Sequence, residues 1–193
     1  MINEKFSFSF LQTYKELFSK KNRNILIGYF ADGVQGLIGA LVWPLFIFLL
    51  LDNNFFSVGF VTSLVVFAAI GVKLIFGNLA DRMSKTKIVK FISFFHALGW
   101  VFKSLVASPF QIFAAGAYHD ITTSATRVSF DSLMYEQAGH YRHYADEYSV
   151  LREIALCLGR FVILIISIIV INFFSLEIMF WVAAVASLFL RKL

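Results

Sequence analysis

Three polar stripes interrupt apolar stretches of this chain at helical spacing. The first contains Asp32 and Gln35, and the second contains Asp120 and Arg127. In each stripe positions i, i+4, i+7 and i+11 share one face of a helix. In full, the stripes are Gly28, Asp32, Gln35 and Gly39; Asp120, Ser124, Arg127 and Asp131; and Ser149, Glu153, Leu156 and Arg160. Ionisable groups inside a membrane are costly, so they face a partner or a wet cavity. Either the stripes lock helices together or they contact a solute or a proton.

Relative depth predicts which of these charges meet. The fourth and fifth apolar stretches run in opposite directions, which places Asp120 level with Arg160 and Arg127 level with Glu153. Opposite charges meet at both levels, so we expect two ion pairs, with Glu153 and Arg160 as buried partners. Asp32 lies at about the depth of Arg127 and has no dedicated partner. Asp32 is therefore the carboxylate that we most expect to bind a proton or contact a solute.

The elements that carry these stripes are transmembrane helices. Hydrophobic residues make up 59% of the 193 residues and include 24 phenylalanines, whereas soluble domains are about 45–50% apolar. Long apolar runs without alternation favour helices over a barrel. We predict an all-α membrane protein with a single six-helix domain over residues 25–193. Its spans are 25–51, 57–79, 88–107, 110–132, 148–172 and 173–190, with turns at Asn53-Asn54 and Ser108-Pro109.

The basic residues predict the orientation of these spans. Lysine and arginine occur in the amino-terminal tail, the second and fourth loops and the carboxyl end, whereas the first, third and fifth loops have none. Basic loops remain in the cytoplasm, so both termini are expected there, with the protein multi-pass in the plasma (cytoplasmic) membrane. Residues 1–24 are predicted to be an amphipathic helix on the bilayer surface. The net charge of +5 thus serves topology, and we expect no nucleic-acid partner.

Several other polar residues are predicted to have structural roles. Lys103 lies near the end of its span, so its side chain is expected to extend to the membrane surface. His96 and the single cysteine, Cys157, are expected to pack in the helical core. No recognised catalytic motif and no complete metal-ligand set occurs in the sequence. We therefore expect no enzyme activity, no cofactor and no bound metal.

The segment GNLADRMSKTK supplies a family resemblance. Gly77, Asp81 and Arg82, in the loop after the second helix, resemble the signature loop of the major facilitator superfamily. Ser84 stands where that family has a second glycine, and Thr86 interrupts the basic run. The segments TRVSFDSLMYE and LREIALCLGR also look like the corresponding family stretches. The resemblance spans roughly residues 25 to 190 and says nothing about the substrate.

This resemblance implies one half of a secondary active transporter that works by alternating access. Family members have two six-helix halves with the solute between them, so the partner is a second copy or a related chain. The first and fourth helices then line a substrate or proton pathway, which contains Asp32, Gln35, Asp120 and Arg127. Proton coupling is one option, and the solute is small and polar or zwitterionic.

The signature loop is also interpreted as a cytoplasmic gate. Asp81 can hold a neighbouring helix end, and Arg82 can pair with Asp131 at the end of the fourth helix. Gly77 belongs to the same gate motif. The alternative interpretation of the chain is a membrane scaffold or accessory subunit that transports nothing and uses the same ion pairs for packing.

Overall fold

The computed structural model describes residues 23–80, 85–140 and 145–192, and every element within these ranges is helical. Because α2, the π-helix and α3 are continuous, the described residues form six rods, as predicted. α6 continues to His140, beyond the predicted end at residue 132. The elements are α2 (Arg23–Leu37), the π-helix η1 (Ile38–Val42), α3 (Trp43–Leu50), α4 (Phe55–Ala80), α5 (Lys85–Ser104), α6 (Pro109–His140), α7 (Ala145–Phe173), α8 (Glu177–Phe189) and the 3-10 turn η2 (Leu190–Lys192).

Short polar turns join α3 to α4 and α5 to α6 where the sequence predicts them. Asp52 and Asn53 have φ of 52° and 60°, a left-handed conformation that aspartate and asparagine tolerate better than most residues. Asn54 then caps α4, because its side-chain oxygen accepts from the Ser57 backbone N–H at 3.1 Å. Pro109 opens α6, where its missing N–H costs nothing. Tight turns of this kind make consecutive rods antiparallel.

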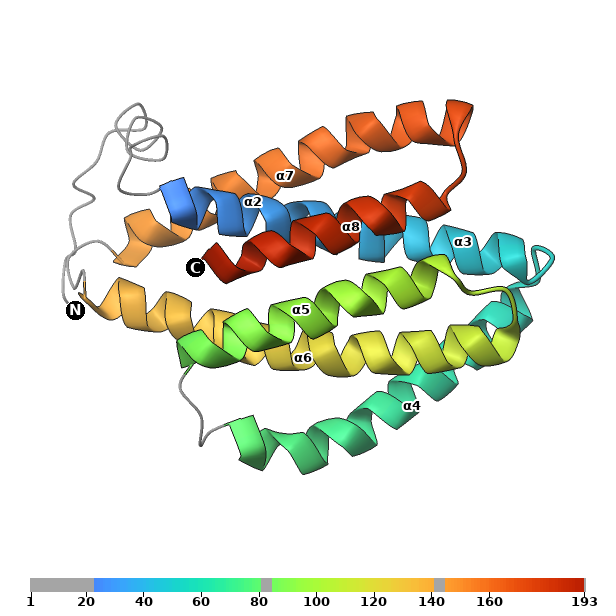
Figure 1. The fold of residues 1–193 in the computed structure, drawn as a ribbon, viewed down its shortest axis with the longest axis horizontal. Helices are drawn as coiled ribbons and strands as arrows, with labels where there is room; N and C mark the ends of the chain where they lie inside the picture. The colour runs from blue at the N-terminus through green and yellow to red at the C-terminus, as the bar shows by residue number, and fades with distance from the viewer. Residues whose placement is uncertain (1–22, 81–84, 141–144, 193) are drawn as a thin grey trace.

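The rods pack in the order α7, α2, α8, α5, α6 and α4. Figure 1 shows them side by side, with α7 and α4 at opposite edges. The beginning of α2 and the carboxyl terminus lie at the same end of the bundle (Figure 1). If α2 is exchanged with α6, α4 with α7 and α5 with α8, the packing order becomes the same order read in reverse. Each pair of neighbouring rods is then replaced by a pair that is also neighbouring. The packing order is therefore symmetric between the first three rods and the last three.

Much of the surface of the bundle is apolar. Leu26–Leu50 and Ser149–Phe173 are both long and apolar enough to cross a membrane. Many large side chains on α7, including Phe161, Ile165 and Ile169, are exposed. Soluble monomers rarely expose contiguous apolar patches of more than a few hundred Å². This surface agrees with association with a membrane.

Two glycines allow α2 and α7 to approach each other closely. A Cβ added at Gly33 would strike the backbone carbonyl of Leu156, and one added at Gly159 would strike the backbone carbonyl of Phe30. Small residues at such crossings let helices pack in the absence of a hydrophobic driving force between them. This contact fixes α2, and with it the first polar stripe, against α7.

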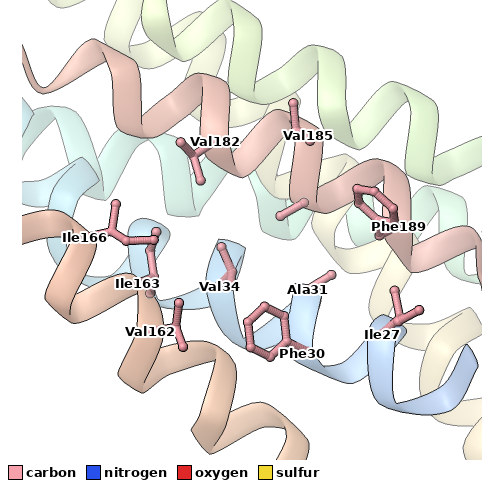
Figure 2. Close-up of a pocket in the computed structure, with 11 residues that line it drawn as sticks. Ile27, Phe30, Ala31, Val34, Val162, Ile163, Ile166, Val182, Val185 and Phe189 are labelled. Carbon is pink, nitrogen blue, oxygen red and sulfur yellow. The ribbon is translucent and has the colours of Figure 1, made fainter. Parts of the chain in front are cut away.

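An apolar cavity of about 350 Å³ lies between α2, α7 and α8. Figure 2 shows Phe30 and Val34 of α2 with Val162 and Ile166 of α7 and Val185 of α8 around it. Its lining consists entirely of apolar side chains. Nothing in that lining can orient a polar solute, so the polar chemistry of the chain must be placed elsewhere.

Candidate functional site: a buried polar network between α2, α5 and α6

The polar stripe of α2 points into the bundle. Asp32 and Gln35 are both buried, and the Gln35 amide donates to Asp32 Oδ1 at 2.8 Å. Arg127 of α6 donates from Nη1 to Asp32 Oδ2 at 3.1 Å. Both carboxylate oxygens of Asp32 therefore accept a hydrogen bond, which the buried charge requires. The Asp32 side chain is 6% exposed, but that of Arg127 is 47% exposed, so this ion pair has one buried end and one open end.

His96 of α5 continues the network from Gln35. The two are joined by a contact of 3.0 Å between His96 Nε2 and Gln35 Oε1. Because the Gln35 amide nitrogen already donates to Asp32, its oxygen faces His96 and must accept. This assigns the proton of a neutral His96 to Nε2 and leaves Nδ1 as an acceptor. The Thr123 hydroxyl lies 3.5 Å from that Nδ1.

Thr123 lies between His96 and His119, and its hydroxyl donates to the His119 backbone carbonyl at 2.7 Å. Its hydroxyl oxygen lies 3.3 Å from His119 Nδ1, and the same ring nitrogen lies 3.2 Å from Lys103 Nζ. The rings of His96 and His119 are 4.7 Å apart between centroids. Because that hydroxyl proton is donated within α6, Thr123 does not donate to either ring, and the polar groups form a row of close contacts through the bundle. Its members, in order, are Arg127, Asp32, Gln35, His96, Thr123, His119 and Lys103.

Two indole rings enclose the Lys103 end of this row. Lys103 Nζ lies 4.4 Å from the Trp43 ring centroid and 4.6 Å from that of Trp100, distances at which an ammonium is attracted by the ring faces. Trp43 follows the π-helix, where its backbone N–H reaches back five residues to the Ile38 carbonyl. Pro44, which lacks an N–H, comes next, and a π segment accommodates that interruption. The proline therefore helps to set the turn that carries Trp43 to Lys103.

The space inside the network is small. A cavity of about 10 Å³ lies among Asp32, Gln35, His96, Thr123, Thr126 and Arg127. That volume is about what one water molecule needs. A solute larger than water does not fit there. Within the described residues, no group of three or more His, Cys, Asp or Glu side chains is arranged to hold a metal ion.

The predicted pairing of the second and third stripes is wrong. Arg127 pairs with Asp32 instead of Glu153, and Arg160 pairs with Glu153 of its own helix at 3.4 Å instead of with Asp120. The cause is the packing order, since α6 and α7 make few contacts and α7 lies against α2. Glu153 and Arg160 are also not buried, because their side chains are 59% and 46% exposed.

Other sequence predictions need correction or lie beyond the described residues. Lys103 is 3% exposed and does not extend to the surface, and Cys157 is exposed instead of packed in the core. Asp120 is partly buried on α6, and within the described residues it forms no ion pair with Arg160. For the gate, Asp81 and Arg82 lie outside the described residues, as does the side chain of Asp131, and Gly77 lies in α4. The amphipathic tail is likewise outside them, except for its last two residues.

Sequence reasoning missed the α5 part of the network. Ser93, His96, Trp100 and Lys103 follow the spacing i, i+3, i+7 and i+10, and all four are buried. This is a fourth stripe on one helix face. His96 and Lys103 taken singly do not indicate this face, but the joint spacing of the four residues does. Comparisons with protein-family models, curated proteins and solved structures each found no match to this chain.

Proposed function

We propose that this chain is one half of a proton-coupled secondary active transporter of the major facilitator type. The proposal rests on the symmetric packing order of the rods. When the first three rods are exchanged with the last three, the same order is obtained in reverse. Inverted three-helix repeats within a six-helix half are a property of that superfamily. The loop containing Gly77, Asp81 and Arg82 adds support from the sequence.

The exposed polar groups support a second half. Arg127 on α6 and the Glu153–Arg160 pair on α7 are about half exposed, and in lipid such groups would be costly. A second six-helix unit would cover them and enclose a water-filled cavity. A homodimer with its twofold axis along the membrane normal gives two halves of the same orientation, as does a related partner chain. The substrate would lie between the halves, since the internal cavity beside Asp32 holds about one water.

The Asp32–Arg127 pair supplies a mechanism for coupling. When Asp32 is ionised, it holds the guanidinium of Arg127 at 3.1 Å. A proton on Asp32 removes that charge, so Arg127 becomes free to bind an anionic group of a solute from its exposed side. Gln35 continues to hold the protonated carboxyl in place. We propose a small zwitterionic or carboxylate-bearing solute on this basis.

Uptake into vesicles tests the proposal. The purified protein is reconstituted and offered radiolabelled amino acids, carboxylic acids and neutral sugars, with and without a proton gradient. We expect at least one charged solute to accumulate only with the gradient, and the same solute to raise the melting temperature of the protein. A scaffold or accessory subunit would show neither accumulation nor stabilisation with any member of the panel.

A further inference from the structure

The amine of Lys103 is not explained by the Asp32–Arg127 mechanism. Lys103 is buried between α5 and α6, and among the described residues no carboxylate lies within ion-pair distance of its Nζ. Its contacts are His119 Nδ1 at 3.2 Å and the faces of Trp43 and Trp100. A buried ammonium with these neutral neighbours lacks full compensation, so the neutral amine competes with it.

The charges that surround Lys103 leave room for one mobile proton. On its own helix the ionisable neighbour is His96, and α6 contributes His119, Asp120 and Arg127. Asp32 comes from α2 and is already satisfied by Arg127. α8, which packs on the other side of α5, has no ionisable residue between residues 178 and 189, and α4 has none between 55 and 71. If Lys103 and His119 were both positively charged, they would repel each other, and no carboxylate of the described residues is in contact with Lys103 to offset that repulsion. The pair is therefore expected to hold one mobile proton.

The geometry between Lys103 and His119 allows that proton to be shared. If Lys103 is an ammonium, it donates to an unprotonated His119 Nδ1. If its N–H bond breaks and the proton moves to Nδ1, the imidazolium donates back to the neutral amine across the same 3.2 Å. His119 Nε2 is buried with no hydrogen-bond partner among the described residues. Nδ1 is therefore the ring nitrogen through which the exchange proceeds.

We propose that Lys103 and His119 form a proton-binding site between α5 and α6, whose charge acts on the Asp32–Arg127 pair through the adjacent His96 ring and Gln35. This inference rests on the proposed transport function, which gives the proton a purpose. Because the His119 ring lies 4.7 Å from that of His96, a change of charge at Lys103 and His119 acts on the polar groups that join α2, α5 and α6. The site therefore links protonation to helix packing.

The tryptophans provide a direct reporter of this site. The chain has three, of which Trp43 and Trp100 face Lys103, whereas Trp181 is exposed on α8. In a protein carrying Trp181→Phe, all remaining indole emission comes from the two rings around the amine. A change of the Lys103–His119 pair between neutral and positive changes the field on both rings. The fluorescence titration needs neither a solute nor flux.

The experiment is an emission titration of the Trp181→Phe protein in detergent from about pH 5 to pH 11, a range that includes the ordinary values of imidazole and ammonium groups. We expect a reversible transition that is lost in Lys103→Met and shifted by at least about one pH unit in His119→Gln, which keeps a hydrogen-bonding side chain but cannot titrate. His96→Gln should retain a transition, and Lys192→Met, which changes an exposed lysine, should leave it unaltered.

Two results would overturn the proposal. One is a flat titration of the Trp181→Phe protein with the native Lys103 and His119, and the other is an unchanged transition in both Lys103→Met and His119→Gln. The result for the native pair decides the matter even if a variant does not fold. A flat titration beside proton-driven uptake would reject this site and leave the transport function standing. A Lys103-dependent transition in a protein that shows no uptake would support this site and reject the transport function.

Discussion

The Asp32–Arg127 pair predicts unequal costs for its two single substitutions. In Arg127→Met, the buried Asp32 carboxylate keeps only the Gln35 amide among its described donors. Breaking a fully buried pair costs about 3–5 kcal/mol, and the half-exposed position of Arg127 lowers our expectation to about 2–3 kcal/mol. In Asp32→Asn, Arg127 can turn to water, and the loss is one charge-assisted hydrogen bond, about 1–2 kcal/mol.

The assay is the free energy of unfolding in mixed detergent micelles, followed by circular dichroism. The double variant should be close to Asp32→Asn alone, because no charge is then stranded. Glu153→Gln with Arg160→Met is the matched control, since that pair has similar geometry but is exposed on both sides. Its cost should be about 0–1 kcal/mol. An equal cost for Asp32→Asn and Arg127→Met, or a larger one for Asp32→Asn, would refute the argument from burial.

Three further predictions concern packing, assembly and topology. Gly33→Ala should destabilise the protein by about 1–3 kcal/mol through a backbone clash with α7, whereas Gly36→Ala, which has open space around it, should be neutral or stabilising; equal effects would contradict the close α2–α7 contact. Native mass measurement in lipid discs should find two six-helix units, and a strictly monomeric protein that transports would count against the two-half arrangement. A cysteine at Asn54 should react with an impermeant reagent from outside and one at Lys192 only after permeabilisation, and the reverse pattern would invert the topology.

The rods and the first stripe were predictable from the sequence. Apolar length defines a helix, and the spacing of Asp32 and Gln35 defines one face of it, so both follow from local pattern. Turn chemistry at Asn53 and Pro109 also depends on local residues. These features need no knowledge of which helices touch.

The partners of the charges were not predictable from depth. Depth places Arg127 level with several groups, and the choice of Asp32 over Glu153 depends on α7 packing against α2, a contact that Gly33 and Gly159 permit. Lys103 was misplaced for a related reason. The position of Lys103 near a helix end indicates that its long side chain can reach the surface. It does not indicate that the side chain is surrounded by two indoles and an imidazole.

Proton movement on addition of solute tests the central claim most directly. Vesicles containing the protein and a pH-sensitive dye are mixed, without an imposed gradient, with each charged solute that accumulated in the uptake panel. The account predicts that solute entry carries protons, that Asp32→Asn abolishes the proton signal, and that Gly36→Ala preserves it. Solute entry without any proton signal, or an undiminished signal in Asp32→Asn, would contradict the account.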